Sequence, residues 1–168
     1  MRSVCALALL VGLGGLVGCG QPSQTVLVEM SAHGQPPDGV ATARFTVEEI
    51  RVFDDVPGIG GQWRTLVSDE EGARTFDLCT LGSGTLAAER DVPQGTLSTL
   101  QISLDLDEGL SGALPLDPDA RSVLELPLPQ LQGNSVHLDV DWDLAATVAR
   151  DGQGRLVLRP AADLKVLP

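Results

Sequence analysis

Ser135-Val136-His137-Leu138-Asp139-Val140-Asp141-Trp142-Asp143 alternates between polar and apolar side chains along its whole length. Successive side chains of a β-strand point to opposite faces of a sheet, so this pattern predicts a strand with one face in a core. The predicted inward residues are Val136, Leu138, Val140 and Trp142, and the predicted outward residues are His137, Asp139, Asp141 and Asp143.

Similar patterns recur from residue 25 to the end of the chain. Thr99–Asp107 has the clearest alternation, and Leu86–Val92 is ambiguous between strand and helix. In Thr99–Asp107 the predicted inward residues are Leu100, Ile102, Leu104 and Leu106, and the predicted outward residues are Gln101, Ser103, Asp105 and Asp107. Asp143 can cap a short helix within Leu144–Arg150. Further strands are expected at Thr25–Met30, Ala43–Phe53, Gln62–Val67, Thr75–Cys79, Val123–Leu128, Arg155–Arg159 and Asp163–Leu167. Short strands separated by glycine and proline turns predict an all-β fold, an antiparallel β-sandwich with one short helix near the C-terminus.

Two local features refine this prediction. In Ala43–Phe53 the inward positions change parity around Glu48-Glu49, which predicts a β-bulge. Pro127 and Pro129 cannot donate backbone hydrogen bonds, so they predict an edge strand or the end of a strand.

Near the N-terminus, the positive charge of Arg2 is followed by an uncharged apolar run that ends in Leu16-Val17-Gly18-Cys19. This order predicts a signal peptide with a lipoprotein cleavage box, cut between Gly18 and Cys19. The alternatives are an ordinary secretory signal or a short anchor. The predicted organisation is a signal peptide at 1–18, a lipidated tether at 19–24 and a single β-sandwich domain at 25–168.

The cleavage box resembles that of bacterial lipoproteins. The resemblance implies diacylglycerol on the thiol of Cys19 and an acyl chain, such as palmitate, on its amino group, so that the partner is the membrane. Gly20 follows instead of aspartate, which resembles the class directed to the outer membrane. We therefore expect a lipid-anchored protein of the cell envelope at the outer membrane, on its periplasmic or its surface side.

Charge and cysteine content exclude other classes. The chain has 11 Lys+Arg and 23 Asp+Glu, a net charge of −12. Because such a surface repels nucleic acid, we expect no nucleic-acid partner. Cys5 leaves with the signal peptide and Cys19 carries lipid, so Cys79 has no partner for a disulfide and is expected to be a small buried hydrophobe.

A series of segments resembles the bacterial lipoprotein family known as domain of unknown function 4382. The resemblance implies a prealbumin-like or immunoglobulin-like sandwich, and it brings no catalytic residues. The segments that carry it are Phe45–Val52, Trp63-x-x-Leu66, Phe76-Asp77-Leu78, Val92-Pro93-x-Gly95, Leu100–Leu104, Leu138–Asp143 and Val148–Pro160.

The candidate metal ligands are Asp139 and Asp141, on the predicted outward face with His137 and Asp143. Their carboxylates suit calcium, and Asp105, Asp107 and Glu108 could add ligands if their strand lay alongside. The spacing fits no calcium-binding loop, so we prefer a solvated strand face. We predict no metal and no cofactor.

The sequence offers two further candidate sites, at Ser83 and at Trp63. Ser83 lies in Gly82-Ser83-Gly84, which is not a nucleophile elbow, and a triad with His33 or His137 has no support from spacing. Trp63 is the candidate ligand-binding residue, as a platform for sugar rings, although we prefer to place it in the core. Trp142 is expected in the core.

We therefore expect a non-catalytic cell-envelope lipoprotein that acts as a binding or structural module. The alternatives are a carbohydrate-binding or adhesion-type surface module, and an envelope hydrolase with an unrecognised site. Whether the partner is a protein or a glycan stays open.

Overall fold

The computed structural model describes residues 22–56, 58, 60–72, 74–105, 114–115, 117 and 119–168. The predicted signal peptide and Cys19 lie outside these residues, as do Asp107 and Glu108. The strands in the described part of the chain form two main sheets.

One sheet has four strands in the order β11 (Ala162–Leu167), β8 (Ser135–Asp143), β1 (Ser23–His33) and β5 (Thr85–Pro93). β8 and β1 run parallel, whereas the other neighbours are antiparallel. The ambiguous segment Leu86–Val92 is therefore a strand, at one edge of this sheet.

The second sheet has the order β3 (Gly60–Val67), β2 (Arg44–Val56), β6 (Thr96–Asp105) and β7 (Val123–Leu131). Its fifth strand, β4 (Arg74–Asp77), pairs with the first part of β2. All these pairs are antiparallel. β7, which contains Pro127 and Pro129, lies at an edge as predicted.

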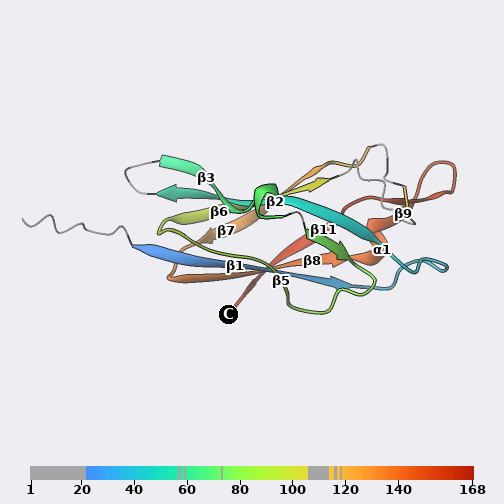
Figure 1. The fold of residues 1–168 in the computed structure, drawn as a ribbon, viewed down its shortest axis with the longest axis horizontal. Coiled ribbons are helices and arrows are strands. Elements are labelled where there is room, and N and C mark those ends of the chain that lie inside the picture. The colour runs from blue at the N-terminus through green and yellow to red at the C-terminus, as the bar shows by residue number, and fades with distance from the viewer. Residues whose placement is uncertain are drawn as a thin grey trace, which may run out of the picture.

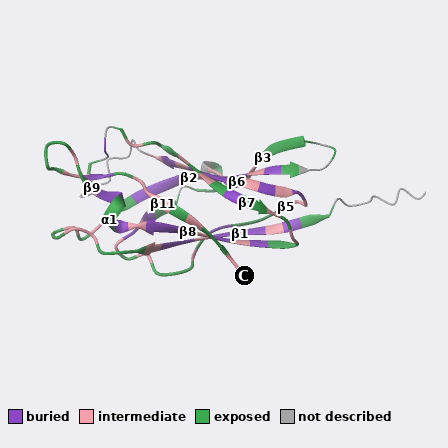
Figure 2. Cartoon of the chain, turned by 180° about the vertical axis from the view of Figure 1, so that it is seen from behind, coloured by how far each residue is buried: buried purple, intermediate pink, exposed green. Residues whose placement is uncertain are grey.

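The two sheets lie face to face and enclose a single hydrophobic core (Figures 1 and 2). Trp142 of β8 is fully buried, and its ring centroid lies 4.3 Å from that of Phe45 in the opposite sheet. The predicted inward residues of β8 and β6 are buried as well: Val136, Leu138, Val140, Leu100, Ile102 and Leu104. The β-sandwich prediction is confirmed.

The predicted bulge in β2 is confirmed at Glu48. Val47 pairs with Leu104 and Glu49 with Ser103, so Glu48 is the extra residue on β2. Because of it, Phe45 and Val47 before the bulge and Ile50 and Val52 after it are all buried in the core.

The short elements lie between the strands. A 3-10 turn, Asp69–Glu71, precedes β4, and the helix α1 (Leu144–Thr147) follows β8. The carboxylate of Asp143 accepts hydrogen bonds from the backbone of Ala145 and Ala146, which confirms its role as a cap. The helix is a single turn within the predicted range Leu144–Arg150, and it ends at Thr147 because β9 (Val148–Arg150) pairs with β10 (Leu156–Leu158).

Candidate functional site

The outer face of the five-stranded sheet carries two neighbouring rows of side chains, each crossing four strands in register. One row, which we call the aromatic row, consists of Trp63, Phe53, Thr99 and Pro127. The next row, which we call the polar row, consists of Thr65, Arg51, Gln101 and Glu125. Each row takes one residue from each of β3, β2, β6 and β7, so only the folded sheet brings its members together.

Trp63 is exposed, with 39% of its surface open to solvent. The preference for a core position was wrong, because Trp63 pairs with Phe53 on the outer face while the neighbouring Leu66 takes the inward position. The Phe53 ring meets the indole edge-on, at 5.3 Å between centroids and 72° between planes. The guanidinium carbon of Arg51 lies 5.0 Å from the ring centroid of Trp63.

Gly61 makes room for this arrangement. A Cβ atom on Gly61 would lie 2.3 Å from the Phe53 ring, so a larger residue would displace it. Phe53, directly opposite Trp63 on β2, and Arg51, two residues away on the same strand, both contact the indole, and these contacts restrict its motion before any ligand binds.

The polar row is joined by hydrogen bonds. Arg51 Nε donates to Gln101 Oε1, and Gln101 Nε2 donates to Glu125 Oε1 at 3.0 Å. Beside the row, Thr65 Oγ1 donates to Glu49 Oε1 at 3.1 Å, and Glu49 Oε2 lies 3.7 Å from Arg51 Nε. Sequence alternation placed Gln101 outward, but nothing in the sequence indicated that β7 and β3 would extend the row.

The outer face of the four-stranded sheet is organised around Asp141. The expectation that Asp141 is solvent-facing was wrong. It does lie on the outer face, but neighbouring strands cover it, and only 5% of it is exposed. His33 Nδ1 lies 2.8 Å from Oδ1, Ser31 Oγ donates to the same oxygen at 3.3 Å, and Lys165 Nζ donates to Oδ2.

These contacts shift three pKa values. Burial opposes the ionisation of Asp141, but hydrogen bonds from Lys165 and His33 outweigh it and hold the pKa of the carboxyl below its usual value. The hydrogen bond to Asp141 raises the pKa of His33 and that of Lys165. Asp141 is thus an ionised carboxylate neutralised by its neighbours.

The candidate metal ligands do not converge. The ammonium of Lys165 already lies against Asp141, Asp139 accepts from Ser31 at 2.8 Å, and Asp143 is turned to its helix cap. Asp105 ends β6, which belongs to the other sheet. Across the described residues, no three His, Cys, Asp or Glu side chains are placed to hold a metal ion.

Ser83, His33 and Asp141 line one hollow of about 520 Å³ on this face. A serine nucleophile needs a hydrogen-bonded base. In the part of the chain that the structure describes, no serine hydroxyl bonds to either histidine, and Ser31 donates to Asp139 and Asp141 instead. Cys79 is a free, half-buried thiol whose pKa burial raises, so it stays protonated.

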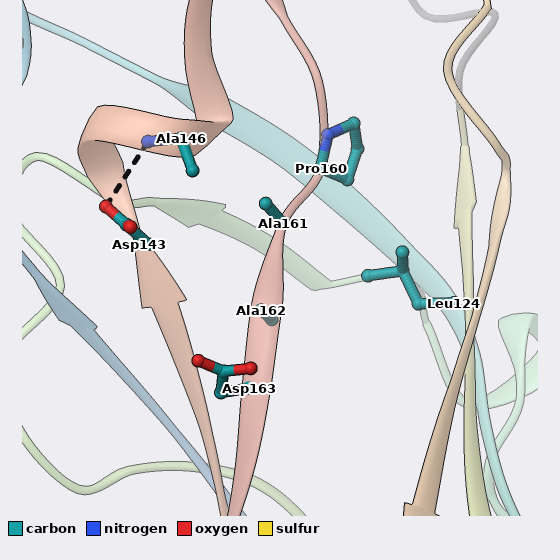
Figure 3. Close-up of a pocket in the computed structure, with 7 residues that line it drawn as sticks. All are labelled: Leu124, Asp143, Ala146, Pro160, Ala161, Ala162 and Asp163. Carbon is teal, nitrogen blue, oxygen red and sulfur yellow. Dashed lines mark hydrogen bonds between the residues drawn. The ribbon is translucent and has the colours of Figure 1, made fainter.

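A second hollow, of about 350 Å³, opens between the edge strands β7 and β11 (Figure 3). Leu124 lies across from Pro160, Ala161 and Ala162, and the carboxylate of Asp163 lies at its margin. The lining is mostly apolar and holds no group placed for chemistry.

Comparison with known proteins places the chain in a family. A family model matches residues 24–160. No curated protein matches. Among solved structures, Serratia marcescens Lip, a membrane-bound component of the type VI secretion system, is 11% identical, with a TM-score of 0.28 over 83% of this chain and 96% of that chain. At that score the likeness supports no argument about fold or function.

Within the described residues, no helix is long and apolar enough to cross a membrane. The family model covers most of the chain and nearly the whole sandwich, from β1 to the end of β10. The chain therefore belongs to the family described as domain of unknown function (DUF4382).

Proposed function

We propose that this chain is a non-catalytic binding module of the cell envelope, anchored by lipid on Cys19, and that it binds its partner through the aromatic and polar rows. The observation that supports this most is the exposed Trp63, whose indole contacts both Phe53 and Arg51. Tryptophan and arginine dominate the energetics of binding surfaces. A side chain that its neighbours already hold in place also loses little entropy on binding.

The non-catalytic part of the proposal is supported by how the titratable groups are used. On the four-stranded sheet, Asp141 is saturated by His33, Ser31 and Lys165. On the five-stranded sheet, Arg51, Gln101 and Glu125 are bonded to one another. Side chains that are hydrogen-bonded to one another in this way are suited to stabilising the conformation of a surface.

The anchoring part of the proposal rests on the cleavage box and on the start of the fold. β1 begins at Ser23, four positions after Cys19. A fully extended chain covers at most about 3.5 Å per residue, so a tether of this length holds the domain within about 15 Å of the lipid. We place the protein at the outer membrane, on its periplasmic or surface side.

Lipidation is tested with the variant Cys19→Ala. The wild-type chain should incorporate labelled palmitate, and the intact mass should match a chain that starts at Cys19 and carries acyl groups. Cys19→Ala should incorporate none. Equal labelling of the variant would refute the lipid anchor and leave the binding surface to be judged by its own experiment.

Binding is tested with full-length protein purified in a detergent without a sugar headgroup and mixed with a delipidated envelope fraction. Wild-type protein should sediment with this fraction, and Trp63→Ala should lose at least about tenfold in apparent affinity, the scale expected of a central aromatic contact. The matched control is Leu86→Ala, since Leu86 is a large hydrophobic residue, 48% exposed, in the other sheet. Sedimentation that is insensitive to Trp63→Ala would refute the proposed surface.

A further inference from the structure

We infer that the ligand of this surface is a glycan, an extended and uncharged chain of hexopyranose rings that lies across the strands. Its apolar C–H surfaces would contact the aromatic row and its hydroxyl groups would bond to the polar row. This inference rests on the proposed function, because it names the ligand of the same surface.

The two rows match the two kinds of surface on a sugar ring. A pyranose has C–H groups on its faces and hydroxyls around its rim, and C–H groups are attracted to the negative face of an aromatic ring. The aromatic row, with Trp63 and Phe53 at one end and Pro127 at the other, gives an apolar track. The polar row runs alongside it at the spacing of alternate residues on each strand.

The polar row also has both kinds of hydrogen-bonding group. A hydroxyl both donates and accepts, so a chain of hydroxyls needs both kinds of partner. Arg51 only donates and the exposed Glu125 carboxylate only accepts, while Gln101, which is 6% exposed, joins the two from below. Their hydrogen bonds to Gln101 hold Arg51 and Glu125 in place before binding, which lowers the entropic cost of ordering them.

The dimensions favour several sugar rings over one. Neighbouring strands lie about 4.8 Å apart, so a row across four strands spans about 14 Å. That span fits roughly three rings of an extended chain, each ring lying above one interval between strands. Affinity should therefore increase from a monosaccharide to a short oligosaccharide and then level off.

Charge determines the class of glycan. The chain carries a net charge of −12, and Glu49 and Glu125 lie on this face. The guanidinium of Arg51 is already shared between Trp63 and Gln101, with Glu49 nearby. An acidic polysaccharide would be repelled, whereas a neutral or N-acetylated one would not.

Tryptophan fluorescence gives a direct measurement. The chain has two tryptophans, and Trp142 is fully buried while Trp63 is exposed. A change in emission on titration therefore reports on Trp63, and the unchanged blue-shifted emission of Trp142 shows that the variants are folded. The probes are chitohexaose, cellohexaose and mannohexaose, their monosaccharides, and a heparin hexasaccharide as the acidic control.

At least one neutral hexasaccharide should change the emission of Trp63, with its monosaccharide at least about tenfold weaker. Calorimetry should show the hexasaccharide affinity lost by about tenfold or more in Trp63→Ala, reduced in Glu125→Ala and unchanged in Leu86→Ala. Binding of heparin alone, or binding unaffected by Trp63→Ala, would overturn the inference.

Failure of the glycan inference can be told apart from failure of the proposed function. If no neutral hexasaccharide binds but sedimentation with the envelope fraction still depends on Trp63, the ligand is not a glycan and the binding module stands. A protein partner would then be indicated by loss of sedimentation after protease treatment of the fraction. If sedimentation does not depend on Trp63, both are wrong.

Discussion

The Nδ1 atom of His33 lies 2.8 Å from Oδ1 of Asp141, and this contact joins the end of β1 to its parallel neighbour β8. The hydrogen bond raises the pKa of His33 above its ordinary value of 6.5, with Asp141 and Asp143 adding favourable charge and Lys165 opposing it. Asp141 stays ionised over the whole pH range in which His33 titrates, because the pKa of Asp141 is lowered below its ordinary value of 3.8.

We predict that this contact makes stability depend on pH. A group whose pKa is raised on folding stabilises the fold fully below its unfolded pKa, and the contribution is lost as the pH rises through the folded pKa. His33→Gln should therefore be less stable than wild type at about pH 5.5, and the difference should shrink by about pH 8.5. Urea unfolding at both pH values measures the difference in unfolding free energy between wild type and His33→Gln, and Ser83→Ala is the control. A difference that is independent of pH would contradict the prediction.

We also predict that Asp141→Asn is destabilising. Sequence alternation alone suggested that this change would hardly matter, but Asp141 accepts from Lys165, His33 and Ser31. Hydrogen bonds to a charged group contribute about 1.5–3 kcal/mol, so a loss of that size is expected in the free energy of unfolding. The matched control is Asp139→Asn, whose Oδ1 has no hydrogen-bond partner and which should cost less. Equal effects of the two variants would refute a special role for Asp141.

Asp54 presents the opposite case. It is fully buried, neither of its oxygens has a hydrogen-bond partner, and Arg64 Nε lies 3.5 Å away. Burial raises the pKa of Asp54, although Arg64 partly offsets this. Asp54 therefore favours folding in its protonated form, and its contribution falls as the pH rises through the folded pKa.

We predict that Asp54→Asn is more stable than wild type at neutral pH by about 1 kcal/mol, the lower end of the cost of an unsatisfied buried group. The advantage should disappear below about pH 4, where the wild-type carboxyl is protonated. Arg64 Nε is buried beside Asp54, but 25% of the Arg64 side chain is exposed, so its charge stays partly solvated in the variant, and an asparagine oxygen can still accept from Nε. Arg64→Met should destabilise instead, because it leaves a buried carboxylate without a counter-charge. Denaturant unfolding of both variants measures these changes in the free energy of unfolding. An Arg64→Met variant that is more stable than wild type would contradict the role of Arg64 as the counter-charge of Asp54.

The strands themselves could be predicted because their signal is local. Alternation in Ser135–Asp143 and Thr99–Asp107 shows which residues face the core without reference to any partner, and the parity change at Glu48 shows the bulge. These patterns follow from the pleat of a single strand. The N-cap at Asp143 is equally local.

The two outer faces could not be predicted, because each depends on register between distant strands. Trp63 looked like a core residue until its pairing with Phe53 placed it outward, and Pro127 completes the aromatic row from β7. Asp141 looked solvated until β1 and β11 brought His33 and Lys165 against it. The contact between His33 and Asp141 depends on the parallel pairing of β1 with β8, and neither segment carries a sequence signal for that pairing.

The bulge at Glu48 gives the sharpest test of how the sequence specifies the sandwich. Deletion of Glu48 joins Val47 directly to Glu49 and leaves an unbroken alternation in which Phe45, Val47, Ile50 and Val52 all face the core, so the variant should lose the bulge and still fold with both pairs buried. Glu48→Ala keeps the extra residue and changes only an exposed side chain, so it should alter stability by less than about 0.5 kcal/mol. Thermal unfolding followed by far-ultraviolet circular dichroism compares the two. A deletion variant that melts far below the wild-type midpoint or without cooperativity would contradict this, because it would show that burial of both pairs depends on the bulge itself.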